Sequence, residues 1–173
     1  MIDLAAKLFG IIGLVTYILA FQCKSSRKLI FISLCSDFSY AIQMFLLGGY
    51  TGCLTLVIAS VYGLIQCCYG KKWAMWSGWR WVFAALYALS SILTWENFFS
   101  ILPFIGATTV TFSNWTRNGR IIRIFRLFVI APVWLTYDFY AGSLSGTVCQ
   151  IFGIVSILVS IYRHGWKGLD QAN

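Results

Sequence analysis

The sequence contains very little charge. Asp, Glu, Lys and Arg make up 10% of its 173 residues, whereas soluble globular domains carry roughly 25%. There are five acidic residues, one histidine and two prolines. A water-soluble protein of this length needs far more polar surface to cover its core. The scarcity of charge therefore excludes an ordinary soluble domain and indicates a protein whose solvent is lipid.

Motifs for metal binding and catalysis are also missing. Zinc sites need paired Cys and His ligands, but the only histidine is His164, and most of the six cysteines fall in apolar segments. There is no phosphate-binding glycine loop, and the segment 142–146, which resembles a nucleophile elbow, has Leu144 where serine is required. We therefore expect no cofactor, no metal and no enzymatic activity.

Long apolar stretches dominate what is present. Hydrophobic residues make up 60% of the chain and aromatic residues 18%. About 20 apolar residues cross a bilayer as a helix, and Trp and Tyr favour its boundaries. Seven transmembrane helices are predicted, at 5–22, 29–48, 51–69, 73–95, 98–115, 121–141 and 145–162. The short connections predict a single all-α membrane domain over 1–173, with a small cytoplasmic tail at 163–173.

Basic residues gather in alternate loops of this predicted topology. Twelve of the thirteen Lys and Arg fall on one side of the helices, in 24–28, 71–80, 117–126 and the tail, and the exception is Lys7. Loops rich in Lys and Arg stay in the cytoplasm. The pattern predicts an N-terminus outside and a C-terminus inside. It also explains the net charge of +8 without nucleic acid as a partner.

Three of these basic residues share one helix face. Arg120, Arg123 and Arg126 are spaced by three near the start of the sixth predicted helix. Long basic side chains near a helix end reach phosphate headgroups. We expect them to bind anionic lipid headgroups, with a cytoplasmic gate as the alternative. The lipid bilayer is the main predicted partner, and a small-molecule solute and homo-oligomerisation stay open as further ones.

The first and last thirds of the chain align at an offset of 94 residues. Seven identities fall in about 40 positions, where so apolar a composition gives roughly three by chance. A Gly-x-x-x-Gly begins at Gly48 and again at Gly142, and Tyr40 aligns with Trp134. This internal repeat predicts two similar triplets of helices, over 5–69 and 98–162.

The orientation of the two triplets follows from the number of crossings. Three helices that start outside end inside, so the linker helix at 73–95 returns the chain before the second triplet begins. The triplets are then parallel and related by an axis along the membrane normal. This 3+1+3 parallel repeat is the arrangement of the SWEET carriers, and we predict a SWEET-like bundle.

The chain resembles a family of small inner membrane proteins. The stretches 101–106 (ILPFIG), 139–147 (FYAGSLSGT) and 45–48 (FLLG) are similar to those of the YgjV-like proteins of bacteria. This resemblance covers nearly the whole chain and implies a multi-pass protein of the bacterial inner membrane, with a periplasmic N-terminus. It supplies no substrate and no catalytic residue.

A more distant resemblance connects the repeat to SWEET and PQ-loop (MtN3-like) carriers. Those carriers usually have Pro-Gln at the end of the first helix of each repeat. Here the first repeat has Phe21-Gln22 and the second has Trp115-Thr116. These departures weaken the expectation that the solute is a sugar.

Asp37 lies in the middle of the second predicted helix. A charged group at that depth costs at least roughly 2.5–3.5 kcal/mol, so it must face protein or water. We expect a proton or substrate site, with a structural hydrogen bond to a neighbouring helix as the alternative. Tyr40 and Trp134 are predicted walls of the same axial cavity, although core packing would also explain them. The predicted substrate-binding residues are Asp37, Tyr40, Ser60, Asn114, Trp134 and Ser156.

Pro132 aligns with the residue after Asp37 in the repeat, and proline frees a backbone carbonyl. We expect a hinge there, with a static kink as the alternative. Asp138 and Glu96 are interpreted as solvated.

The favoured function is a small-solute carrier or facilitator that works by rocking of two three-helix bundles. A non-transporting scaffold or lipid-binding subunit is the alternative. A cavity that reaches Asp37 favours the carrier, and a dry core favours the scaffold.

Overall fold

The computed structural model describes residues 2–22, 26–68, 70–116 and 118–168, which form helices and turns without any strand. In chain order the elements are α1 (Ile2–Gln22), α2 (Ser26–Leu46), α3 (Tyr50–Cys67), α4 (Trp79–Leu93), η1 (Phe98–Ser100), α5 (Ile101–Trp115), α6 (Gly119–Phe125), η2 (Arg126–Ile130), α7 (Ala131–Tyr140) and α8 (Leu144–Gly168). Because α6, η2 and α7 follow without a break, they form one rod. The described residues therefore make seven rods, which confirms the predicted all-α class.

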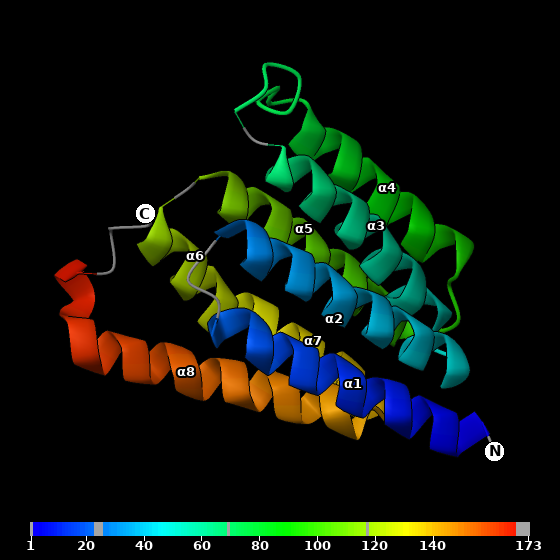
Figure 1. Cartoon of the computed structure of the whole chain (residues 1–173). Helices are drawn as coiled ribbons and strands as arrows, with labels where there is room; N and C mark the ends of the chain where they lie inside the picture. Colours follow the sequence, from blue (N-terminus) through cyan, green and yellow to red (C-terminus); the bar gives the residue numbers. More distant parts are fainter. Residues whose placement is uncertain (1, 23–25, 69, 117, 169–173) are drawn as a thin grey trace.

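The rods are arranged as a closed ring (Figure 1). α1 packs on α2, α2 on α3, α3 on α5, α5 on α7, α7 on α8, and α8 returns to α1. α4 lies outside this ring, against α3 and α5. Each predicted triplet thus supplies three consecutive rods of the ring, and the centre of the bundle lies between the two triplets.

Two helix boundaries differ from the prediction by six residues, and the others by three or fewer. The fourth helix begins at Trp79 rather than at 73, because the chain first turns at Gly70, whose φ is +107°. The indole of Trp79 donates to the carbonyl of Trp73 at 2.8 Å and closes this turn. The last helix continues to Gly168, into the predicted tail. The basic-loop residues 23–25 and 117, and the tail residues 169–173, lie outside the described residues.

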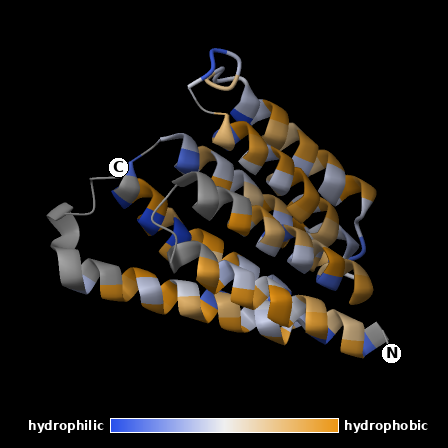
Figure 2. Ribbon diagram, in the orientation of Figure 1, coloured by the Kyte–Doolittle hydropathy of each residue, from blue (hydrophilic) through white to orange (hydrophobic). Residues whose placement is uncertain are grey.

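The outer surface is apolar and the interior contains many polar side chains. Leu93 is 71% exposed and Phe139 is 78% exposed, whereas Thr55 and Thr111 are fully buried. Apolar residues cover much of the outer faces of the helices (Figure 2). In water such a surface would drive association, whereas lipid would solvate it. α3, with 18 residues and a mean hydropathy of 1.5, is the one helix in the described part that is long and apolar enough to cross a membrane by itself.

The same backbone turn occurs twice, 94 residues apart. Gly48 after α2 and Gly142 after α7 have φ values of +82° and +73°. In each turn the amide after the glycine donates to the carbonyl five residues earlier, at 2.9 and 2.8 Å. This is the glycine-terminated helix end in which only a residue without Cβ avoids strain. The Gly-x-x-x-Gly that aligns in the sequence therefore has one local geometry at both places.

Candidate functional site

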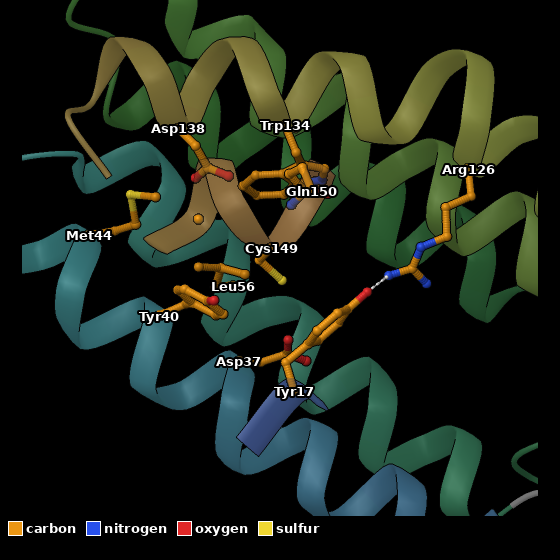
Figure 3. Close-up of a pocket in the computed structure, with 11 residues that line it drawn as sticks. Tyr17, Asp37, Tyr40, Met44, Leu56, Arg126, Trp134, Asp138, Cys149 and Gln150 are labelled. Atoms are coloured by element: carbon orange, nitrogen blue, oxygen red, sulfur yellow. Dashed lines mark hydrogen bonds between the residues drawn. The ribbon is translucent and has the colours of Figure 1, made fainter. Parts of the chain in front are cut away.

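A cavity of about 110 Å³ lies inside the ring (Figure 3). That volume is enough for several water molecules or a small solute. The walls come from α1, α2, α3, η2, α7 and α8. The lining residues are Tyr17, Asp37, Tyr40, Met44, Leu56, Arg126, Trp134, Asp138, Gly146, Cys149 and Gln150.

Six of these lining residues form three pairs with the repeat spacing of 94. The pairs are Tyr40 with Trp134, Met44 with Asp138, and Leu56 with Gln150. One member of each pair lies on α2 or α3, and the other lies on α7 or α8. Equivalent positions of the two aligned segments therefore meet around one space.

Asp37 lies on α2, half-buried, at the wall of this cavity. No hydrogen bond from the described residues reaches its carboxylate. The flanking hydroxyls of Ser36 and Ser39 donate instead to the carbonyls of Gly13, at 2.8 Å, and Cys35, at 2.9 Å. The helix-to-helix hydrogen bond that was the alternative interpretation of Asp37 is thus made by its neighbour, and the carboxylate is left for the cavity.

A second carboxylate, that of Asp138 on α7, lines the cavity at 3% exposure. The interpretation of Asp138 as a solvated boundary residue is therefore wrong. Gly146 on α8 explains the burial, because a Cβ at Gly146 would lie 2.6 Å from the Asp138 Cγ. The glycine lets α8 approach and cover the last turn of α7. Glu96, by contrast, is exposed as expected.

The guanidinium of Arg126 lies inside the bundle. Its Nη2 donates to the hydroxyl of Tyr17 at 2.7 Å, the dashed line in Figure 3. Arg126 was predicted to bind lipid headgroups, but its place is the cavity wall, where it is half-buried. Arg120 and Arg123 precede it on α6 and are also half-buried.

The Tyr17–Arg126 contact separates two cavities. Both residues line the central cavity, and both also line a second cavity of about 310 Å³. Arg123 and Ser156 are on the walls of the second cavity, at the end of the bundle where the basic residues of α6 lie. The 2.7 Å contact is thus the partition between an interior site and a basic vestibule.

The two aromatic walls are seated on glycines. A Cβ at Gly13 of α1 would lie 3.1 Å from the ring of Tyr40, and a Cβ at Gly106 of α5 would lie 2.6 Å from the indole nitrogen of Trp134. Each ring therefore packs on the first helix of its own triplet. Tyr40 is 8% exposed, and its hydroxyl meets the thiol of Cys149, another residue of the cavity wall.

The structure brings Asp37, Tyr40 and Trp134 together but not the other predicted binding residues. Ser60 donates to the carbonyl of its own helix at Leu56, at 2.9 Å. Asn114 on α5 does not line the central cavity, and Ser156 lines the second one.

Tyr17 and Cys149 were not expected at the site, although both line the cavity. A single Tyr or Cys in an apolar helix carries no sequence signal that separates it from ordinary core packing. Within the described residues, no group of three or more His, Cys, Asp or Glu is placed to hold a metal ion.

Pro132 lies on the exposed side of α7, directly after the π-helical turn η2. A proline lacks the amide that would bond the preceding turn, so a wider turn before it is the expected response. η2 begins at Arg126. The irregular segment therefore connects the proline to the residue that closes the cavity.

Comparison with known protein families gives a match over most of the chain. The model of the Imp-YgjV family, described as bacterial inner membrane protein, matches residues 4–167. The resemblance drawn from the glycine-containing motifs is thereby confirmed. No curated protein and no solved structure matches the chain.

Proposed function

The chain belongs to this family of bacterial inner membrane proteins, and we propose that it is a multi-pass carrier or facilitator of a small solute. In this proposal the seven rods cross the membrane with the N-terminus in the periplasm and the C-terminus in the cytoplasm. The two triplets form a parallel 3+1+3 repeat, with α4 as the linker. The solute site is the central cavity.

The observation that carries this proposal is the cavity at Asp37. A scaffold would be expected to have a dry core, in which a carboxylate at this depth is hydrogen-bonded to a neighbouring helix. Instead the Asp37 carboxylate faces a space of about 110 Å³ and accepts no hydrogen bond from the described residues. The paired positions around that space support an axis between two bundles that rock against each other.

The Tyr17–Arg126 contact provides the gate of this carrier. It closes the central cavity toward the vestibule on the basic side, which is the side predicted to face the cytoplasm. Bending at η2 and Pro132 would carry Arg126 away from Tyr17 and join the two cavities. Pro132 would then be the hinge, and Arg120 would hold the same end of the rod at anionic lipid headgroups.

The test uses a cysteine that the cavity already contains. Cys149 lines the cavity and is 4% exposed. The other five cysteines are replaced by Ala, and a membrane-impermeant methanethiosulfonate is added to right-side-out spheroplasts or to inverted vesicles. If the cavity opens alternately, Cys149 reacts from both sides. Ala107 is also 4% exposed but lies in a packed cluster away from the cavity. Ala107→Cys in a Cys-free chain is therefore the matched control.

Two results would contradict the carrier. Labelling of Cys149 no faster than that of Ala107→Cys, from either side, would indicate a closed core and favour the scaffold. Labelling from one side alone would indicate a pocket that does not alternate. Faster labelling than the control from both sides is the expected result.

A further inference from the structure

The charged groups around the central cavity do not balance. Asp37 comes from α2, Asp138 from α7 and Arg126 from η2, and no other Asp, Glu, Lys or Arg is among the lining residues. Arg126 is bonded to the neutral hydroxyl of Tyr17, not to either carboxylate. With all three ionised, the cavity carries one uncompensated negative charge. In a site of low dielectric constant such a charge attracts a cation and repels an anion.

The neutral walls suit an organic cation. Rings of Tyr17, Tyr40 and Trp134 line the cavity, and the faces of such rings attract cations, most strongly when the site is shielded from water. The buried Tyr40 hydroxyl, whose partner in the cavity is the Cys149 thiol, a weak hydrogen-bonding group, offers an oxygen to an N–H donor. The site thus supplies carboxylates, aromatic faces and a hydroxyl around the same space.

A bare metal ion fits these walls less well. Calcium takes six to eight oxygen ligands, and the described residues contain no group of three or more acidic, His or Cys side chains arranged for a metal. Much of the remaining lining is apolar or aromatic, including Met44 and Leu56. Resting on the proposed carrier function, we infer that the central cavity binds a small organic cation, an ammonium group on a short aliphatic skeleton.

The test compares two thiol reagents that differ in charge. In purified protein with Cys149 as the only cysteine, the rate of labelling is measured with trimethylammonioethyl methanethiosulfonate and with sulfonatoethyl methanethiosulfonate. Each rate is divided by the rate of the same reagent with a free thiol in solution. Because both reagents attack the same thiolate, the ratio of the two normalised rates does not depend on the ionisation of Cys149.

We expect the cation to react faster than the anion by on the order of tenfold or more. Asp37→Asn and Asp138→Asn should each lower this ratio several-fold, whereas Glu96→Gln, at an exposed carboxylate that does not line the cavity, should change it much less. Choline chloride should slow the labelling more than sodium chloride at equal ionic strength. The ratio in the chain with both aspartates intact does not depend on how the variants fold.

The outcomes separate this inference from the proposed function. A ratio near one or below it, or a ratio that neither Asp substitution changes, would contradict the cation site while Cys149 still reacts. Equal slowing by choline and sodium would reduce the preference to a general attraction for positive charge and overturn the organic class. If neither reagent labels Cys149 at all, the result contradicts the proposed carrier function rather than the preference for a cation.

Discussion

Polar side chains inside the bundle divide into two groups by their hydrogen bonds. Ser36 on α2 donates to a backbone carbonyl of α1, and Gln43 bonds the hydroxyls of Ser143 and Ser145 on the opposite side of the ring. Such contacts hold helices together where no water competes. Asp37, at the cavity, has no such bond in the described part of the chain. The hydrogen bonds therefore assign packing roles to Ser36 and Gln43, whereas Asp37 is left to the cavity that it lines.

Replacing Tyr17 with Phe tests the gate at the level of one atom. The substitution removes the 2.7 Å hydrogen bond to Arg126 and keeps the ring. Hydrogen bonds to charged groups contribute about 1.5–3 kcal/mol, so the closed partition should weaken. Labelling of Cys149 from the cytoplasmic side should become several-fold faster than in the parent Cys149-only chain.

A matched control exists at the other end of the molecule. Tyr140→Phe removes a hydrogen bond of the same length, from the Asn97 side chain to the Tyr140 hydroxyl, at an exposed position. It should leave the labelling rate unchanged. Equal rates for Tyr17→Phe and the parent chain would show that this contact does not limit access.

Part of this site could be predicted from the sequence, and there are physical reasons why some of its residues could be predicted and others could not. Asp37 was identifiable because a carboxylate in mid-membrane has few acceptable positions, and Tyr40 and Trp134 because they align in the repeat. Small hydroxyls such as Ser60 bond to their own helix, so their presence says nothing about a cavity. The burial of Asp138 depends on the close approach of α8, which no local pattern reveals.

At the level of elements, the rod formed by α6, η2 and α7 is the one with a built-in irregularity. Pro132 is exposed, so Pro132→Ala leaves no cavity in the core. Alanine restores a backbone donor, which should favour a regular α-helix over the π-helical turn. We expect a more stable protein, with a higher thermal midpoint in detergent, and slower labelling of Cys149 from one side of the membrane. Unchanged two-sided labelling would make the proline a static kink.

Two glycines at the junction of α2 and α3 give a second test at this scale. Gly48 lies in the turn after α2, and Gly52 lies in the first turn of α3. A Cβ at Gly48 would meet nothing within 4 Å, so Gly48→Ala costs only the strain of its positive φ, roughly 1–2 kcal/mol. A Cβ at Gly52 would lie 2.5 Å from the ring of Tyr137, whose hydroxyl accepts the Gly52 amide at 2.9 Å.

Gly52→Ala should therefore lower the thermal midpoint in detergent more than Gly48→Ala. The cause would be disruption of a contact between the two triplets rather than strain within one turn. Equal losses for the two variants would indicate that α3 and α7 are free to move apart at this point.

Helix types and most boundaries followed from the apolar runs, and the exceptions have local causes. α4 begins six residues late because Gly70 reverses the chain and the indole of Trp79 holds the turn. Apolar aromatic residues here form a loop, so hydrophobicity alone overestimates the length of the helix. As a result α4 has 15 residues and rises about 22 Å, less than the roughly 30 Å of the hydrocarbon core.

At the scale of the whole molecule, the proposed axial site depends on how the two triplets are oriented. Equivalent turns, paired cavity residues and a ring in which each triplet supplies three consecutive rods all fit two parallel units. Parallel units require that α4 crosses the membrane. α4 and α5 have 15 residues each, which makes them the shortest of the helices proposed to cross as a single unbroken rod. The crossing of α4 is therefore the step to measure.

The direct measurement labels the two ends of α4 in intact cells. Lys71→Cys precedes the helix and Glu96→Cys follows it, and both side chains are exposed. Each is introduced into a Cys-free chain and treated with a membrane-impermeant maleimide before and after permeabilisation. We predict that Glu96→Cys reacts in intact spheroplasts and Lys71→Cys reacts only after permeabilisation. Labelling of both positions from the same side would contradict the parallel arrangement and the axial site built on it.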